Sequence, residues 1–325
     1  MQQDKFDVIV VGELNVDLIL NDIDGFPEIQ KEKLASQLTL TLGSSSAIFA
    51  SNLSSLNTSV SFIGKIGQDS FGEKVLDSLK EKNVNTDFIV IDDALKTGVT
   101  VALNYDQERA MVTHPGAMTE LGVDDITDEQ LAEAKHLHFS SYFLQPKIAN
   151  DLHILMKRAK DLGLTTSLDP QWDPDEKWEM DLEKILPHVD VFLPNELELM
   201  HLSGTEDWEK SVRQLSNFGN NIIVKLGSKG SAYLENGQIK QVKPYQNNNV
   251  VDAIGAGDSF NAGFIRKFIE GATIEECAKF GNLMGALSTT GSGGTGAFAD
   301  WQVLKETAAK KFNTNISDDY YEKSN

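Results

Sequence analysis

Short apolar runs alternate with longer amphipathic segments along most of the chain. Residues 6–11 form a mainly apolar run that ends at Gly12, which is typical of a strand buried on both faces, as in a parallel sheet. Six further runs have the same character, at 60–66, 136–139, 165–168, 189–193, 222–226 and 232–234. Helical spacing is found at 44–56, 71–82, 149–162, 206–218 and 259–270. This alternation predicts βαβ units and an α/β fold with a mostly parallel central sheet.

Two regions break this alternation. Residues 13–42 hold two short strand-like runs, at 16–20 and 38–42, and no helical pattern. Residues 97–113 have the pattern of a hairpin with a turn near Asp106. We therefore expect 13–42 and 97–113 to form a small antiparallel β-sheet that acts as a lid. The α/β core then comprises 1–12, 43–96 and 114–325, with a frayed polar tail from 313 onward.

Composition narrows the class of protein. Hydrophobic residues are 40% of the 325-residue chain and charged residues 24%, as in soluble globular proteins. The net charge of −20 disfavours a nucleic-acid partner. The single cysteine, Cys277, falls in an apolar helical pattern and is expected to be buried and inert. The N-terminus lacks the pattern of a signal peptide, and no apolar run has the length of a membrane span, so we expect a cytoplasmic protein without a membrane partner.

A glycine-rich turn at 252–258 carries the most specific chemistry. Phe260, Phe264 and Phe268 follow it at four-residue spacing, which predicts a helix with one face on the core. Small residues at 255–257 let the backbone approach a ligand closely. The first N–H groups of a helix are unpaired and lie at the positive end of its dipole, so they can bind an anion. Asp258 either caps this helix or takes a proton from a hydroxyl held beside a phosphate.

The segment 252–263, DAIGAGDSFNAG, resembles the C-terminal signature of the ribokinase-like (PfkB) carbohydrate kinases. The resemblance implies a ribokinase-like three-layer sandwich and ATP-dependent phosphoryl transfer, with Asp258 as the general base. Residues after the first aspartate are usually hydroxylated in that family, whereas this chain has Ala253 and Ile254. The anion hole implied by the resemblance consists of Gly255, Ala256 and Gly257.

Three further segments concern the acceptor. GELNVD at 12–17 resembles the family segment whose aspartate grips sugar hydroxyls, which is Asp17 here, although an aspartate at a strand end or turn has the same pattern. Gly43 and Ser44 match a paired-glycine motif in which the second glycine has become serine, and the family's sugar-contacting asparagine falls at Ile48. Asp169 follows a predicted strand at the ligand edge of the sheet and is expected in the acceptor pocket or just behind it.

Two segments and Asn282 match the nucleotide side of the family. Asn195 and Glu198 match the family's Asn-x-x-Glu element, which organises Mg²⁺ and its waters, with Glu198 acting through water; the same residues also fit a capped helix start. KLGSKG at 225–230 resembles the nucleotide-side loop and equally fits a hairpin turn. The residues expected to bind the nucleotide are Asn195, Lys225, Gly227, Gly230 and Asn282.

The sequence thus predicts a kinase for an unphosphorylated sugar or sugar acid of the ribose, fructose or ketodeoxygluconate type. A nucleoside kinase and a sugar-phosphate kinase stay open, although a second phosphate normally needs arginine or lysine nearby, and Arg109 is the only arginine in the two lid regions. A catalytically silent sugar or nucleotide sensor is the alternative from another class. ATP and Mg²⁺ are the implied cofactors, a monovalent cation such as K⁺ is a further candidate, and a homodimer through the lid is implied by resemblance.

Overall fold

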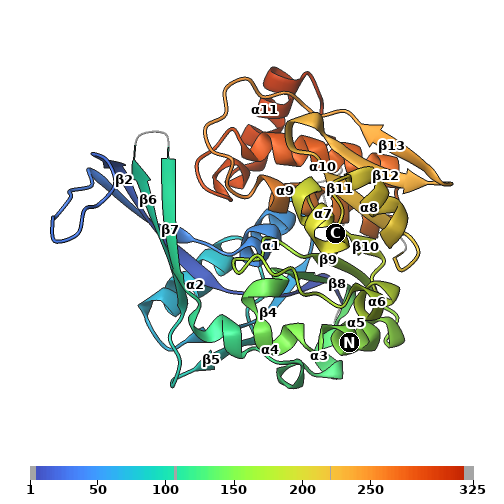
Figure 1. Cartoon of the computed structure of the whole chain (residues 1–325), viewed down its shortest axis with the longest axis horizontal. Coiled ribbons are helices and arrows are strands. Elements are labelled where there is room, and N and C mark those ends of the chain that lie inside the picture. Colours follow the sequence, from blue (N-terminus) through green and yellow to red (C-terminus); the bar gives the residue numbers. More distant parts are fainter. Residues whose placement is uncertain (1–4, 106–107, 220, 318–325) are drawn as a thin grey trace.

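The computed structural model describes residues 5–105, 108–219 and 221–317, so the predicted turn at Asp106 and the end of the tail lie outside it. Nine strands form the main sheet in the order β13-β12-β11-β10-β9-β8-β1-β4-β5 (Figure 1). Pairing is parallel from β5 to β11 and antiparallel among β11, β12 and β13. This confirms the predicted, mostly parallel sheet. The strands are β1 (Phe6–Val11), β4 (Val60–Gly67), β5 (Ile89–Asp92), β8 (Ala134–Ser140), β9 (Thr165–Asp169), β10 (Val191–Phe192), β11 (Asn221–Lys225), β12 (Ser231–Glu235) and β13 (Gln238–Val242).

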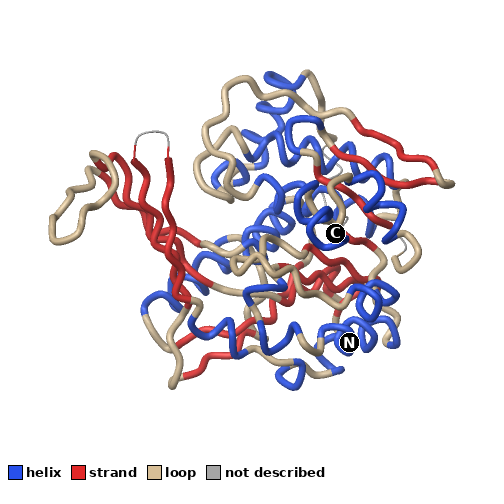
Figure 2. Tube along the Cα trace, in the orientation of Figure 1, coloured by secondary structure: helices blue, strands red, loops and turns tan. Residues whose placement is uncertain are grey.

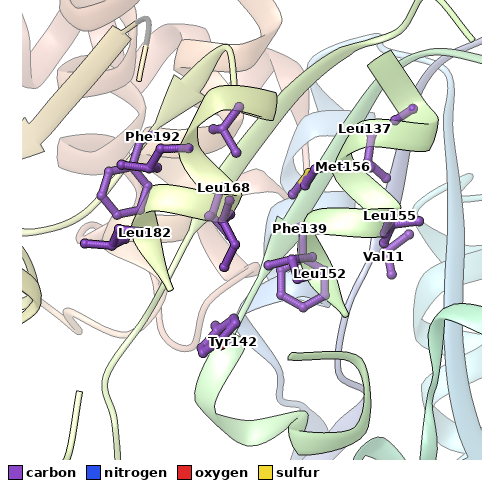
Figure 3. Packing of buried hydrophobic residues seen from close by; sticks show 14 of the residues in the cluster. Val11, Leu137, Phe139, Tyr142, Leu152, Leu155, Met156, Leu168, Leu182 and Phe192 are labelled. Atoms are coloured by element: carbon purple, nitrogen blue, oxygen red, sulfur yellow. The ribbon is translucent and has the colours of Figure 1, made fainter. Parts of the chain in front are cut away.

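Helices cover both faces of this sheet because its strands are apolar on both sides (Figure 2). In β1, Ile9 and Val11 belong to one buried cluster, shown in part in Figure 3, whereas Val8 and Val10 belong to the cluster on the opposite face. The first cluster is covered by α3 (Asp128–Ala132), α4 (Pro146–Ala149), α5 (Leu152–Asp161), α6 (Leu182–Ile185), α7 (Glu196–Ser203) and α8 (Trp208–Leu215). The second is covered by α1 (Ser45–Ser55), α2 (Ser70–Glu81), α9 (Ala256–Ile269) and α10 (Ile274–Ser288), and α11 (Trp301–Phe312) packs outside α10.

A separate four-stranded sheet projects from the main body (Figure 1). Its order is β3-β2-β6-β7, with antiparallel outer pairs and a parallel β2–β6 pair in the middle. Cross-strand neighbours share a face, so Asp17, Thr100 and Thr113 lie on the same face of the sheet. The residues directly before and after each of them in its strand lie on the opposite face. The strands are β2 (Asn15–Ile23), β3 (Gln37–Leu42), β6 (Gly98–Tyr105) and β7 (Glu108–His114).

Several elements differ in extent from the prediction. The helix expected at 149–162 is interrupted, because α4 ends at Ala149 and a separate helix, α5, begins at Leu152. The strand expected at 189–193 has only two residues, and Pro194 follows it closely. Cys277 is fully buried, as predicted. In the described part of the chain, none of the helices combines the length and apolarity needed to cross a bilayer.

Candidate active site

The start of helix α9 lies at the centre of the candidate active site. The helix begins at Ala256, after Gly255, which has a φ of 71°. A Cβ on Gly255 would lie 2.7 Å from the Cα of Gly294, so both the left-handed backbone and the close contact require glycine here. Asp258 is consequently the third residue of the helix and is almost fully buried. The interpretation of Asp258 as the helix cap is wrong, since Gly255 occupies the capping position.

Backbone N–H groups and one ammonium group converge at this helix start. Among the described residues, the N–H groups of Gly255 and Gly257 have no hydrogen-bond acceptor, whereas that of Ala256 contacts the Ala253 carbonyl at 3.3 Å. The Nζ of Lys225 lies 3.7 Å from the position that a Cβ on Gly257 would take. An anion at this point would meet both the positive end of the helix dipole and a lysine charge.

Asp169, at the end of β9, is the buried centre of a charged network. It has no exposed surface, and its Oδ2 accepts hydrogen bonds from Lys225 Nζ at 2.6 Å and from Gln171 Nε2 at 3.0 Å. The same oxygen accepts a hydrogen bond from Asn261. The expectation that Asp169 lines the acceptor pocket is therefore corrected, because a buried carboxylate bonded in this way offers no surface to an acceptor. It lies behind the site and holds Lys225 in place.

Carboxylates outnumber cations in this network, and the imbalance perturbs their pKa values. Burial, together with the charge of Asp169, raises the pKa of Asp258 to about 8, while Lys225 and a hydrogen bond from Gln171 act in the opposite direction. Burial and Asp169 likewise raise the pKa of Glu198 to about 7. Burial by itself would lower the pKa of Lys225, but Asp169 and Glu198 outweigh it and raise that pKa. The site is thus short of positive charge, which a cation or a set of hydrogen-bond donors would supply.

Asn195 and Glu198 form a capping box at the start of α7. The Asn195 side chain accepts a hydrogen bond from the Glu198 N–H at 2.9 Å, and Glu198 Oε2 accepts one from the Asn195 N–H at 2.8 Å. The alternative interpretation as a helix cap is therefore confirmed. No group of three or more His, Cys, Asp or Glu side chains in the described chain is arranged to hold a metal directly. Buried oxygen atoms and surplus negative charge do fit a hydrated Mg²⁺, which keeps several of its own waters.

A cavity of about 320 Å³ opens on the other side of the helix start. Gly230, with a φ of 94°, approaches so closely that a Cβ there would lie 2.1 Å from the Val242 carbonyl. Asn282 holds the same wall, because its Nδ2 donates to the carbonyls of Val242 and Lys243. The structure therefore brings all but Asn195 of the predicted nucleotide residues to one cavity. Its lining includes Lys225, Gly227, Gly230, Ala256, Gly257 and Asn282.

Asp17 lies at the root of the small sheet, beside Gly43. Asn15 Nδ2 donates to Asp17 Oδ1 at 3.2 Å, and a Cβ on Gly43 would lie 2.4 Å from that same oxygen. Burial raises the pKa of Asp17 to about 6, against the lowering effects of Asn15 and of Arg109. The glycine at 43 is thus required for the Asp17 side chain to have room.

The two departures from the family pattern have local structural explanations. Ser44 keeps a φ of 69°, a conformation that favours glycine, and its hydroxyl accepts a hydrogen bond from the Ala47 N–H at 2.9 Å and donates to the Glu13 carbonyl at 2.6 Å. Ser44 therefore caps α1 while holding a strained backbone. The Ile48 side chain packs against the glycine-rich turns instead, because a Cβ on Gly294 would lie 2.4 Å from its Cδ1.

Two residues in this region were not predicted from the sequence. Glu13 is buried, accepts hydrogen bonds from the N–H and hydroxyl of Ser46, and has a pKa raised by burial. Gln171 Nε2 donates to Asp258 Oδ1 at 3.0 Å as well as to Asp169. The only sequence signal was proximity, since Glu13 lies in the Asp17 segment and Gln171 lies two residues after Asp169.

Known proteins match this chain over most of its length. The family model described as "pfkB family carbohydrate kinase" matches residues 5–301. An uncharacterized sugar kinase from Archaeoglobus fulgidus is 32% identical over 237 residues, which are 72% of this chain and 92% of that protein. An ATP-dependent ribose-1-phosphate kinase from Halopiger xanaduensis is 29% identical, with 89% of this chain and 94% of that protein covered.

Solved structures agree with the sequence match. The structure of Arabidopsis thaliana ribokinase complexed with ribose and ATP has a TM-score of 0.80 to this chain at 26% identity. The match covers 93% of this chain and 98% of the ribokinase chain. From the family match, the fold and the arrangement of the site, we conclude that this chain belongs to the pfkB family of carbohydrate kinases, which are phosphotransferases with an alcohol group as acceptor.

Proposed function

We propose that this sugar kinase transfers the γ-phosphoryl group of ATP to a hydroxyl of an unphosphorylated sugar or sugar acid of the ribose, fructose or ketodeoxygluconate type. The observation that carries the proposal is the position of Asp258. It is buried in the first turn of α9, directly after the N–H groups of Gly255 and Gly257 that have no acceptor among the described residues, and Gly257 lines the cavity on the nucleotide side. A carboxylate at that point is able to deprotonate a hydroxyl while the adjacent donors hold the phosphoryl oxygens.

In the proposed reaction the acceptor oxygen attacks the γ-phosphorus as its proton passes to Asp258. A new P–O bond forms, and the bond between the γ-phosphorus and the bridging oxygen breaks, so that the electron pair leaves with ADP. The N–H groups of Gly255, Ala256 and Gly257 stabilise charge on the transferred group, and Lys225 approaches it from β11. Phosphoryl transfer depends mainly on such positioning and electrostatics. Closure of the small sheet as a lid would exclude water as a competing acceptor.

We assign Mg²⁺ to the surplus negative charge around Glu198. Mg²⁺ would neutralise charge on the nucleotide phosphates. Glu198 and Asn195 are hydrogen-bonded to each other, so neither side chain is free to turn fully toward a metal. They would therefore bind the waters of Mg²⁺ and not the ion itself. Omission of Mg²⁺ should abolish ATP consumption, and replacement of K⁺ by a bulky organic cation in the same assay tests whether a monovalent cation is needed.

The charge of the acceptor side favours an unphosphorylated acceptor. Glu13, Asp17 and Asp258 supply three carboxyl groups there, and Arg109 is an exposed residue already bonded to Asn104. A phosphate on the acceptor would meet this negative field without a built set of basic donors. The name of the Halopiger relative keeps a sugar phosphate as the alternative to be tested, together with a nucleoside. ATP as donor also favours a cytoplasmic location.

We further propose a homodimer in which the small sheets of two copies pack together. The middle of the face opposite Asp17 is apolar in all four strands, because the cross-strand neighbours there are aliphatic, and His114 shares this face at the end of β7. Its base packs against α2, but Leu38 and Val112 are 63% and 73% exposed. An uncovered apolar face of this kind is expected to recruit a second copy. The face consists of Leu18, Leu20, Leu38, Leu40, Val101, Leu103, Ala110 and Val112.

Light scattering on the purified protein tests the dimer. Leu38→Glu should shift the mass from dimer to monomer, because it places a charge in the apolar face. Met111→Glu is the matched control, since Met111 is equally exposed at 63% but lies on the opposite face. Equal effects of the two substitutions, or a monomeric wild-type protein at micromolar concentration, would exclude this interface.

The phosphotransferase activity is tested by ATP consumption against a panel of sugars, sugar acids, sugar phosphates and nucleosides. We expect turnover with an unphosphorylated sugar or sugar acid and loss of turnover in Asp258→Asn. Wild-type rates in Asp258→Asn would refute the proposed base. Sugar binding without turnover for every member of the panel would instead establish the silent sensor.

A further inference from the structure

Gln171 connects the candidate base to the buried ion pair behind it. Its Nε2 donates to Asp258 Oδ1 and to Asp169 Oδ2, both at 3.0 Å. Its backbone N–H also contacts Asp169 Oδ1 at 3.3 Å. The two hydrogens of one amide nitrogen are therefore shared between two carboxyl groups. The reversed amide would place its oxygen against both carboxylates, so electrostatics fix the orientation that is observed.

We infer that Gln171 is a positioning residue that fixes the Asp258 carboxyl group for proton abstraction. Its hydrogen bond occupies Oδ1 of Asp258 and leaves Oδ2, which has no hydrogen-bond donor among the described residues, to receive the acceptor proton. This inference rests on the proposed function for the identity of the acceptor. A base that must take a proton from one particular hydroxyl gains rate when its free oxygen is held in a single direction.

The chain around Gln171 is held in a conformation that ordinary residues avoid. Gln171, Glu176 and Trp178 have φ values of 60°, 56° and 56°, and left-handed backbone at residues other than glycine costs free energy. Asp173 is buried and stabilises this segment by accepting hydrogen bonds from the N–H groups of Asp175 and Trp178, at 2.9 and 2.6 Å. Such strain persists only where the surroundings enforce it, and functional sites are where it concentrates.

Aromatic packing also holds this strained segment in place. The Trp178 ring stacks on His201 of α7 with centroids 4.7 Å apart and planes 4° apart, and it meets Phe143 edge-on at 5.5 Å. Trp172 adds an edge-on contact to Trp178 at 4.9 Å. The segment that follows β9 is thus anchored to α7 and to the loop after β8. Gln171 is presented to Asp258 by a rigid support, as a positioning role requires.

The charged groups around Asp258 determine what loss of Gln171 would do. Asp169 faces it from β9, Lys225 from β11 and Glu13 from the segment between β1 and β2. Gln171 is the neutral donor in this set, and its hydrogen bond favours the charged form of Asp258. Removing it raises the pKa of the base. The acidic limb of the pH–rate profile should then move to higher pH.

Gln171→Met tests the inference, because methionine keeps the length of the side chain and removes both donors. We expect kcat at pH 7 to fall on the order of 10- to 100-fold, the KM for ATP to change little, and the acidic limb of the kcat profile to move to higher pH. Asp173→Ala should give a weaker effect in the same direction, since it loosens the support of Gln171.

Gln145→Met is the matched control. Gln145 is another glutamine at the carboxyl edge of the sheet; it is fully buried, whereas Gln171 is partly buried, and its Nε2 likewise donates to two acceptors, the carbonyls of Ser140 and Ser141. It should lower Tm without moving the acidic limb. If Gln171→Met lowers Tm to the same extent and leaves both kcat and the acidic limb unchanged, Gln171 is merely structural and the inference is wrong, although the kinase activity itself stands.

A second measurement separates this inference from the proposed function. The Asp258 carboxyl titration is followed by infrared difference spectroscopy in the unliganded protein, with Asp258→Asn used to assign the band. A higher titration midpoint in Gln171→Met supports the inference even if no acceptor in the panel is phosphorylated. An unchanged midpoint overturns it whether or not the wild-type protein is an active kinase.

Discussion

Replacing Lys225 should affect both the stability of the protein and its proposed binding of the nucleotide. Its side chain is 11% exposed and its ammonium group lies 2.6 Å from the fully buried Asp169 carboxylate. Lys225→Met keeps most of the side-chain volume and removes the charge. Asp169 is then left buried without its main counter-ion, an arrangement that costs about 3–5 kcal/mol. For a domain of this size the corresponding loss in Tm is roughly 4–7 °C.

The same substitution should impair nucleotide binding, because Lys225 lies at the junction of the helix start and the cavity that we propose binds the nucleotide. We expect an increase in the KM for ATP with little change in the KM for the acceptor. Thermal unfolding and initial-rate kinetics on one protein preparation measure both effects. Lys65→Met is the control, since Lys65 is also buried and pairs with Asp125 at 3.0 Å outside the site, so it should lower Tm and leave the KM for ATP unchanged.

A double-mutant cycle with Asp169→Asn tests the electrostatic argument itself. Asp169→Asn alone should cost less than Lys225→Met, because the lysine then still faces Glu198 and Asp258. The double variant should lose less free energy of unfolding than the two single variants lose together. Each single variant leaves one buried charge without its partner, whereas the double variant removes both charges. Strict additivity, or a loss below about 1 kcal/mol in Lys225→Met, would refute the buried ion pair as the source of stability.

Three other predictions follow from the site. In the unliganded protein the raised pKa values of Asp258 and Glu198 mean that the folded state binds more protons than the unfolded state, so stability should decline as the pH rises from about 4 to 8; Asp258→Asn should flatten this decline in a series of thermal melts, and an unchanged slope would contradict it. Binding of ATP with Mg²⁺ should release protons near pH 7, measured as a buffer-dependent heat in calorimetry, because a cation placed beside Glu198 lowers the raised pKa of that carboxyl group. Ser44→Ala should lower the free energy of unfolding by about 1–2 kcal/mol through loss of the cap, and Ser44→Gly should lose less, because glycine relieves the φ of 69°; the reverse order in urea titrations would show that the strain is not real.

The parts of the fold that follow from local pattern were predictable from the sequence. Apolar runs of strand length identified seven of the nine strands of the main sheet, because these strands are buried on both faces, as in Val8 to Val11. The short edge strands β5 and β13 were not predicted. The start of α9 was predictable because small residues followed by phenylalanines at four-residue spacing leave few other structures open. Strand β10 was overestimated in length, since the apolar pattern continues through Val189 and Leu193 although only Val191 and Phe192 pair with neighbours.

The contacts between distant segments were not predictable in this way. Gln171 and Asp258 are 87 residues apart, and neither has a flanking pattern that indicates the other. The role of Asp169 was only half predicted, because its place at a strand end was evident while its full burial depends on Lys225 and Asn261 from other elements. For Asn195 and Glu198 the predictable role was the local one. A helix cap has a recognisable sequence pattern, whereas the proposed metal role of the same residues depends on distant segments.

The departures at Ser44 and Ile48 bear most directly on the choice between an active kinase and a silent sensor. Decay of a site after loss of function should leave positions that are unsupported, whereas both residues here are integrated. Ser44 caps α1 with the hydroxyl that glycine lacks and retains the unusual φ. Ile48 fills the space against Gly255 and Gly294, so it supports the turn that presents the anion site. The changes therefore preserve the phosphate side and alter only the groups that the acceptor side presents. This favours an active kinase whose acceptor contacts differ from the family pattern over a protein that has stopped transferring phosphate.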